Sequence, residues 1–450
     1  MTEDVLGNEV GNATPEAQSG INNFIEGFLG YETRAENVSA AAMADPDSAL
    51  AQIYAALIAL FRGTRTGVKE AQTWLDKAEQ SSGDAPERVQ MNLAMVTALA
   101  IGDIPQALRI GDEIVDAHPT DLVAMKLHQN INFNRGNAPE MLRIARKVLP
   151  HNADNPHVHG MLAFGYEECH FLDKAEVSAQ RALELKSKEP WAQHALAHVM
   201  LTRGQVPEGR AFLTDVSSTW EGLNSFMYTH NWWHAALFDI SLGDFDAVFA
   251  AYDRHCWGID KDFAEDQIGA VSLLARMEFA GLDVGDRWQD VAERLKPRAD
   301  DTLQPFTTMQ YLYGLAKAEL AEADKLMAAV TERAANATPF EKLAWAGVAK
   351  PACRGLLAHA RGDHAAAVDA LSFAMPRMME IGGSHAQRDL FAQVLLDAHI
   401  KCGHYATAQQ MLESRRAYDP NGVPLNRMLA GIYEKLGLLE EADEARARHY

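Results

Sequence analysis

Apolar residues recur at intervals of three and four along most of the chain, which is the spacing of amphipathic helices. Leu162, Ala163 and Tyr166 follow this spacing, and it returns over residues 175–182 after a short polar break. No stretch alternates apolar and polar residues for long enough to suggest a sheet. The pattern therefore predicts an all-α protein.

Short turns between the predicted helices recur at a fixed interval. Gly102, Gly136, His170 and Gly204 are each 34 residues apart. The interval then lengthens and returns to 34 at the end of the chain, through Gly243, Gly281, Gly362, Gly403 and Gly437. Helix pairs that repeat every 34 residues are the tetratricopeptide pattern. We expect a right-handed superhelix of antiparallel helix pairs over residues 21–450 without a domain boundary, preceded by a flexible N-terminus of residues 1–20.

Charge and composition narrow the classes of partner. The 450 residues carry 41 Lys and Arg against 62 Asp and Glu, a net charge of −21 with histidine neutral. This excess of carboxylates argues against nucleic acid and anionic membranes as partners. The N-terminus does not resemble a signal peptide, no long uncharged apolar span is present, and four scattered cysteines lack metal-binding spacing. We therefore expect a cytoplasmic protein.

Histidines are concentrated where the repeat is most regular. Eleven of the 17 lie between His118 and His255, and two pairs are spaced i, i+4: His194 with His198, and His230 with His234. That spacing places both rings of a pair on one helix face. In a tetratricopeptide superhelix the first helix of each repeat lines the concave surface, and its inward positions can be numbered by placing the turn residue fifteenth in the repeat. Those positions are occupied by His157, Glu167, Glu168, Trp191, His194, His198, His230 and Trp233, and His234 lies one position further round the helix.

These inward residues permit several kinds of chemistry. The four paired histidines could bind Zn²⁺ with Glu167 or Glu168 as a further ligand, although neither pair encloses the glutamate of a metalloprotease motif. Without a metal, histidine beside a glutamate and shielded by Trp191 and Trp233 suits general acid/base catalysis. The same residues could bind a ligand without chemistry, or simply pack between helices.

A second motif lies far along the chain, at residues 382–390. Ser384 could cap a helix that carries His385 and Asp389 on one face. A helix N-terminus attracts anions, and Arg388 would add to this, although an ordinary helix start with a surface ion pair explains the pattern equally well. If the superhelix curls, this segment would close a pocket built mainly from residues 156–240.

Together these segments resemble the tetratricopeptide repeat protein 38 family. The resemblance covers nearly the whole chain and rests on residues 44–46, 165–168, 174–176, 181–183, 191–199, 208–209, 230–234 and 382–389. It implies a cytoplasmic helical-repeat protein in which the two long motifs form one signature, consistent with a shared pocket. The chain departs from the family at 305–310, where Thr308 and Gln310 stand in place of an expected acid and histidine.

The leading hypothesis is a protein that binds and processes a small polar molecule by acid/base or metal-assisted chemistry of the hydrolase type. The residues expected to carry the chemistry are His194, His198, His230, His234 and Glu167. Those expected to bind the substrate are Glu168, Trp191, Trp233, His157, His385, Arg388 and Asp389. The alternative is an adaptor that holds a peptide or a partner protein, although clamps for peptide carboxylates favour inward Lys and Arg, and Lys126 is nearly alone here.

Overall fold

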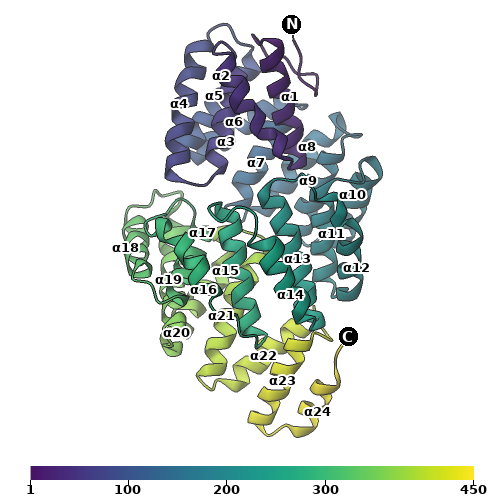
Figure 1. The fold of residues 1–450 in the computed structure, drawn as a ribbon, viewed down its shortest axis with the longest axis vertical. Helices are drawn as coiled ribbons and strands as arrows, with labels where there is room; N and C mark the ends of the chain where they lie inside the picture. Colours follow the sequence, from purple (N-terminus) through teal and green to yellow (C-terminus); the bar gives the residue numbers. More distant parts are fainter. Residues whose placement is uncertain (1) are drawn as a thin grey trace. The chain divides into compact units, whose positions relative to one another are not determined.

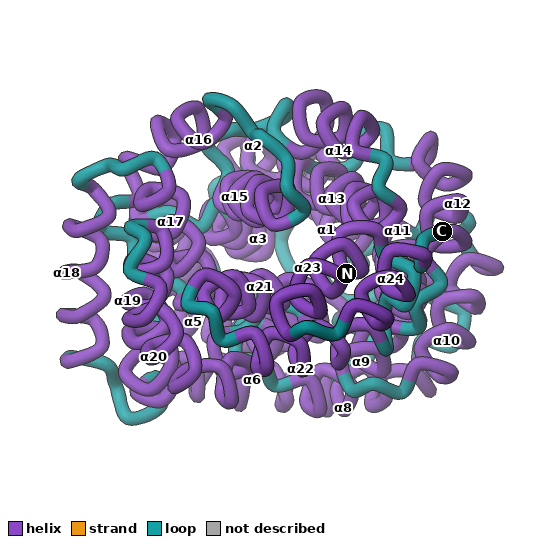
Figure 2. Tube along the Cα trace, turned by 90° about the horizontal axis from the view of Figure 1, so that it is seen from below, coloured by secondary structure: helices purple, strands orange, loops and turns teal. Residues whose placement is uncertain are grey.

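A computed structural model describes residues 2–450. These residues form helices joined by short loops and contain no strand beyond two isolated bridges (Figures 1 and 2). The α-helices are α1 (Pro15–Gly30), α2 (Asn37–Ala44), α3 (Ala49–Phe61), α4 (Arg65–Ser81), α5 (Glu87–Ala100), α6 (Ile104–Ala117), α7 (Leu122–Phe133), α8 (Ala138–Val148), α9 (Pro156–Glu168), α10 (Leu172–Leu185), α11 (Pro190–Thr202), α12 (Val206–Val216), α13 (Ser225–Leu242), α14 (Phe245–Ala251), α15 (Ala264–Phe279), α16 (Arg287–Leu295), α17 (Pro305–Lys317), α18 (Glu322–Ala335), α19 (Lys350–Ala360), α20 (His364–Ala374), α21 (His385–Lys401), α22 (Tyr405–Arg416), α23 (Val423–Leu436) and α24 (Leu439–Ala447). None of the described helices is long and apolar enough to cross a lipid bilayer.

From α3 onward the helices form antiparallel pairs, as the 34-residue interval predicts. The four turn residues Gly102, Gly136, His170 and Gly204 all adopt the left-handed backbone conformation, with φ between 59° and 80°. Later turns do the same, and Glu319, with φ of 57°, occupies the turn between α17 and α18 that no glycine marks. The fold is therefore a tetratricopeptide-like array.

The array is divided into two compact units, whereas the sequence predicts no boundary. Unit 1 comprises the residues up to Ala195 together with Thr219–Met227, and unit 2 comprises Leu196–Ser218 and Tyr228–Tyr450. The boundary falls inside α11, because the segment after α12 returns to unit 1. There the indole nitrogen of Trp220 donates a hydrogen bond to Gln193 at 2.9 Å, and the amide of Asn224 donates to the carbonyl of Tyr31 at 2.7 Å.

The N-terminal segment, expected to be flexible, is packed into unit 1. Helix α1 begins at Pro15 and is capped by the Thr14 side chain. Before it, the buried carboxylate of Asp4 pairs with Arg88, which also pairs with Asp121. The carbonyl of Glu9 accepts two further hydrogen bonds from the same guanidinium. Because a buried arginine needs partners, the polar residues that suggested flexibility instead fix this segment.

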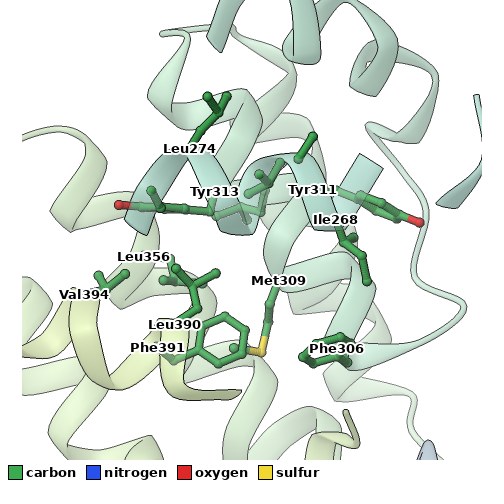
Figure 3. Packing of buried hydrophobic residues seen from close by; sticks show 14 of the residues in the cluster. Ile268, Leu274, Phe306, Met309, Tyr311, Tyr313, Leu356, Leu390, Phe391 and Val394 are labelled. Atoms are coloured by element: carbon green, nitrogen blue, oxygen red, sulfur yellow. The ribbon is translucent and has the colours of Figure 1, made fainter. Parts of the chain in front are cut away.

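The core of unit 2 positions the helices that carry the candidate site. Figure 3 shows apolar side chains from α15, α17 and α21 meeting in one cluster, with Tyr311 and Tyr313 directed to opposite sides of α17. Phe306 contacts Phe391 edge to face, with ring centroids 6.2 Å apart. This packing holds α21 against α15 and α17, so that the first turn of α21 has a defined place within the unit.

Candidate functional site

Helix α13 brings one predicted histidine pair and a tryptophan together. The ring of His230 stacks on Trp233, with centroids 5.3 Å apart and planes 9° apart. His234 meets both rings edge on, at 4.8 Å from His230 and 4.9 Å from Trp233. His234 is fully buried and Trp233 is 2% exposed. The i, i+4 spacing therefore produces a contiguous aromatic group in which His234 and Trp233 are buried and His230 is partly exposed.

Two other helices of unit 2 add a histidine each. His198 comes from α11, is fully buried, and its ring lies 4.6 Å from that of His234. His385, the first residue of α21, places its Nε2 atom 3.5 Å from Nδ1 of His198. Residues 187 positions apart are thus in contact, as the idea of a shared pocket requires. We call His198, His230, His234 and His385 the histidine cluster.

The spacing within the histidine cluster suits a metal ion. One ring nitrogen from each of His198, His230 and His234 lies within 4.8 Å of the others, and one from His385 lies within the same distance of His198. Nitrogen ligands at 2.0–2.1 Å around a tetrahedral metal are roughly 3.4 Å apart. The 4.8 Å limit is compatible with that separation.

Burial favours the neutral form of one member of the histidine cluster, which is the form that binds a metal. Desolvation, reinforced by the neighbouring His198, lowers the pKa of His230 to about 3. A neutral imidazole presents a lone pair, whereas a protonated one cannot bind a cation. The ring of His230 is therefore neutral at neutral pH.

The turn before α21 is built to hold His385 in place. Gly382 and Gly383 have φ of 85° and 76°, and a Cβ on Gly383 would lie 2.6 Å from the ring of Phe306. The Ser384 hydroxyl accepts a hydrogen bond from the amide of Gln387, whose side chain in turn accepts from the Ser384 amide. This capping box confirms the predicted helix start.

Charged residues surround the first turn of α21. Arg388 donates a hydrogen bond to the Gly383 carbonyl, so its guanidinium supports the turn. Asp389 accepts hydrogen bonds from Arg415 of α22 and from Gln393. Although burial opposes ionisation, Arg415 and Arg276 hold the pKa of Asp389 well below its usual range. The substrate-binding roles expected of Arg388 and Asp389 stay predictions.

The remaining candidate residues belong to unit 1. His194 stacks on Trp191 at 4.5 Å, and Phe164 packs against both rings. His157 lies 3.1 Å from the fully buried carboxylate of Glu189. Two acidic residues end α9: Glu167, which is buried, and Glu168, which is partly exposed.

Two residues of α17, Thr308 and Gln310, differ from those expected from the resemblance, and the structure explains the first. The hydroxyl of Thr308 donates to the backbone carbonyls of Asp301 and Gln304, at 3.0 Å and 2.7 Å. Thr308 therefore binds backbone carbonyls that precede the first turn of α17, its own helix. Gln310 is 2% exposed, and its amide nitrogen has no hydrogen-bond partner.

Three residues near these sites were missed by sequence reasoning. Glu189 precedes Pro190 at the start of α11, where its carboxylate accepts a hydrogen bond from the Ala192 amide. Arg276 and Arg415 act on Asp389 from other helices. A usable signal existed for Arg276, since its charge interrupts an apolar run in the sequence of α15.

Lys126 also has an unusual environment in unit 1. It is 2% exposed, and its ammonium donates to the carbonyls of Phe28 and Leu29 at the end of α1, at 2.6 Å and 3.2 Å. The ring centroid of Tyr31 lies 3.4 Å away. Burial lowers the pKa of Lys126 to about 7, although Glu189 opposes the shift.

The lowered pKa of Lys126 predicts a specific dependence of stability on pH. In the unfolded chain this lysine binds a proton up to about pH 10.4, so between pH 7 and 10 the unfolded state holds more protons than the folded state. The free energy of unfolding should therefore rise with pH in this window, by at most about 1.4 kcal/mol per unit for one group. Denaturant titrations at several pH values should show that the free energy of unfolding of the wild type rises between pH 7 and 10. The Lys126→Met variant should lack this rise, and equal slopes in the two proteins would contradict the prediction.

No protein-family model matches the sequence. Among solved structures, the chain is similar to human IFIT1, determined as a dimer with m7Gppp-AAAA, at 12% identity and a TM-score of 0.44, covering 97% of this chain and 95% of that one. It is also similar to yeast Tom70, at 14% identity and a TM-score of 0.36, covering 96% of this chain and 88% of that one. Similarities this low do not indicate what the chain binds.

Proposed function

We propose that this chain is a binding protein of the tetratricopeptide type and that its histidine cluster holds a divalent transition metal ion of the zinc class. The observation that carries the proposal is the set of imidazole nitrogens from His198, His230 and His234, mutually within 4.8 Å. Imidazole is a good ligand for zinc, cobalt, nickel and copper, and a neutral ring such as that of His230 binds such an ion without first losing a proton.

The proposal is limited to binding, and the carboxylate nearest to His385 along α21 does not supply a base for hydrolysis. A hydrolytic site needs a group that accepts a proton near neutral pH. The carboxylate that α21 carries one turn after His385 is Asp389, and its oxygens accept hydrogen bonds from Arg415 and Gln393. With its pKa held low, Asp389 is a weak base. The proposal therefore assigns the cluster to holding a ligand.

Metal loading tests the proposal. Full-length protein stripped with a chelator should bind one Zn²⁺ per chain in a calorimetric titration, and Co²⁺ should give the intense visible bands of a tetrahedral site. His230→Ala with His234→Ala should abolish both signals. His151→Ala, an exposed histidine of unit 1, is the matched control and should leave them unchanged. Equal binding by the double variant would overturn the assignment.

The second candidate is an adaptor function, in which the repeats bind a peptide or a partner protein. The helix-pair architecture favours it, because stacked pairs expose an extended surface on which many side chains can contact one partner. If the chelator-treated protein takes up no metal while remaining folded, this becomes the better account.

Membership of the tetratricopeptide repeat protein 38 family belongs to the same proposal. Its support is that the two motifs on which the resemblance rests, residues 191–199 with 230–234 and residues 382–389, both contribute to the histidine cluster. A cytoplasmic location is proposed on the same resemblance.

A further inference from the structure

A buried arginine lies beside the histidine cluster. Arg276 of α15 is 3% exposed, and its guanidinium donates to the Ser272 hydroxyl and to the carbonyls of Ser272 and Ala386, the two carbonyls at 3.3 Å and 2.8 Å. It also covers the ring of Trp233, with 5.2 Å between the guanidinium carbon and the ring centroid. Arg276 therefore touches the helix of His230 and His234 on one side and the first turn of α21 on the other.

The charge of Arg276 is not matched by a direct partner. Among the described residues no carboxylate oxygen lies within 4.0 Å of its guanidinium. Asp389 acts on it only at longer range, and its oxygens are already bound by Arg415. Burial lowers the pKa of Arg276 to about 10, which still leaves it protonated at neutral pH. A buried cation without a counter-ion is costly, so the site favours an anion.

A second, independent feature points to the same kind of ligand. Trp233 is 2% exposed, yet its indole N–H has no hydrogen-bond partner. A buried donor without an acceptor carries its full desolvation cost. The first turn of α21 adds the positive end of a helix dipole next to Ala386.

We propose that Arg276 and the indole N–H of Trp233 bind a small oxyanion, the phosphate or carboxylate group of a ligand that enters beside the histidine cluster. A guanidinium matches the two oxygens of either group, and an N–H donor completes the contact. The anion supplies the charge that unit 2 lacks at this point. The site requires no metal, so it stands apart from the zinc proposal.

Calorimetry and thermal unfolding of the chelator-treated full-length protein test the site. Inorganic phosphate and acetate are titrated separately at constant ionic strength, so that binding of a phosphate group is distinguished from binding of a carboxylate group. One or both should bind and raise the melting temperature. Arg276→Met should weaken anion binding by at least tenfold. Arg276→Lys keeps the charge but lacks the planar guanidinium, so its anion affinity should lie between those of the wild type and Arg276→Met.

Two further variants keep the outcome interpretable. Trp233→Phe retains the ring and removes the donor, so it should weaken anion binding by roughly tenfold without loss of folding. Arg294→Met, at an exposed arginine of α16, is the control and should bind as the wild type does. His198→Ala should lose zinc but keep the anion, which separates failure of this inference from failure of the metal proposal. Absence of binding by both anions, or equal binding by Arg276→Met, would overturn it.

Discussion

Replacing Arg88 with alanine is expected to lower the free energy of unfolding by about 3–5 kcal/mol. Arg88 is 3% exposed and pairs with Asp121 at 2.8 Å and with Asp4 at 3.3 Å, both of which have almost no exposed side-chain surface. The variant leaves these two carboxylates buried without their cation, and the Glu9 carbonyl loses its donors. Because the network ties residues 4–9 to α5, the N-terminal segment should also detach.

Denaturant titration measures the loss, and hydrogen exchange of residues 2–14 measures the detachment. Arg109→Ala is the matched control, because its pair with Glu113 is exposed and such pairs contribute about 1 kcal/mol or less. If Arg88→Ala cost no more than the control and left exchange unchanged, the buried network would not be what holds the N-terminus.

Replacing His198 with alanine is expected to weaken zinc binding by about 100-fold or more. Loss of a supporting side chain around a metal already costs 10–100-fold, and removal of a ligand costs more. His198 is the member of the histidine cluster that approaches both His234 and His385. Calorimetry with Zn²⁺ gives the affinity, and the rise in melting temperature at saturating zinc should shrink in parallel.

A cysteine at the same position provides a sharper control. His198→Cys keeps a ligand atom near the cluster, since a thiolate binds zinc well. It should restore part of the affinity and add a sulfur-to-metal charge-transfer band when Co²⁺ is bound. If alanine and cysteine variants both bound zinc as the wild type does, the metal would have to lie elsewhere.

Much of the fold follows from the spacing of the turns. The 34-residue interval correctly places the helix pairs, because a left-handed residue lies in the turn inside each pair from α3 onward. Glycine marks most of these turns, so they are visible in the sequence. Glu319 occupies such a turn without a glycine, which is why the sequence shows no turn between Gly281 and Gly362. The boundary inside α11 could not be predicted, since it depends on where residues 219–227 pack.

The candidate site was predictable only where its residues share a helix. The His230 and His234 rings meet because i, i+4 spacing dictates it, and His385 was expected to approach the groove only if the array curled. Arg276 and Arg415 reach the first turn of α21 from other helices, and no local pattern reveals such contacts. The contact of the N-terminal segment with Arg88 was equally hidden, because Asp4 and Arg88 are far apart in the sequence.

The central claim is that the histidine cluster holds a metal through imidazole nitrogens, and X-ray absorption at the zinc edge tests it most directly. For the loaded full-length protein we predict a first shell of three or four nitrogens at about 2.0 Å, with the outer-shell scattering of imidazole rings. Cys256 and Cys353 are buried and burial raises the pKa of both thiols, so no sulfur is expected. A shell containing sulfur, a shell of oxygens alone, or protein that takes up no zinc would contradict the claim.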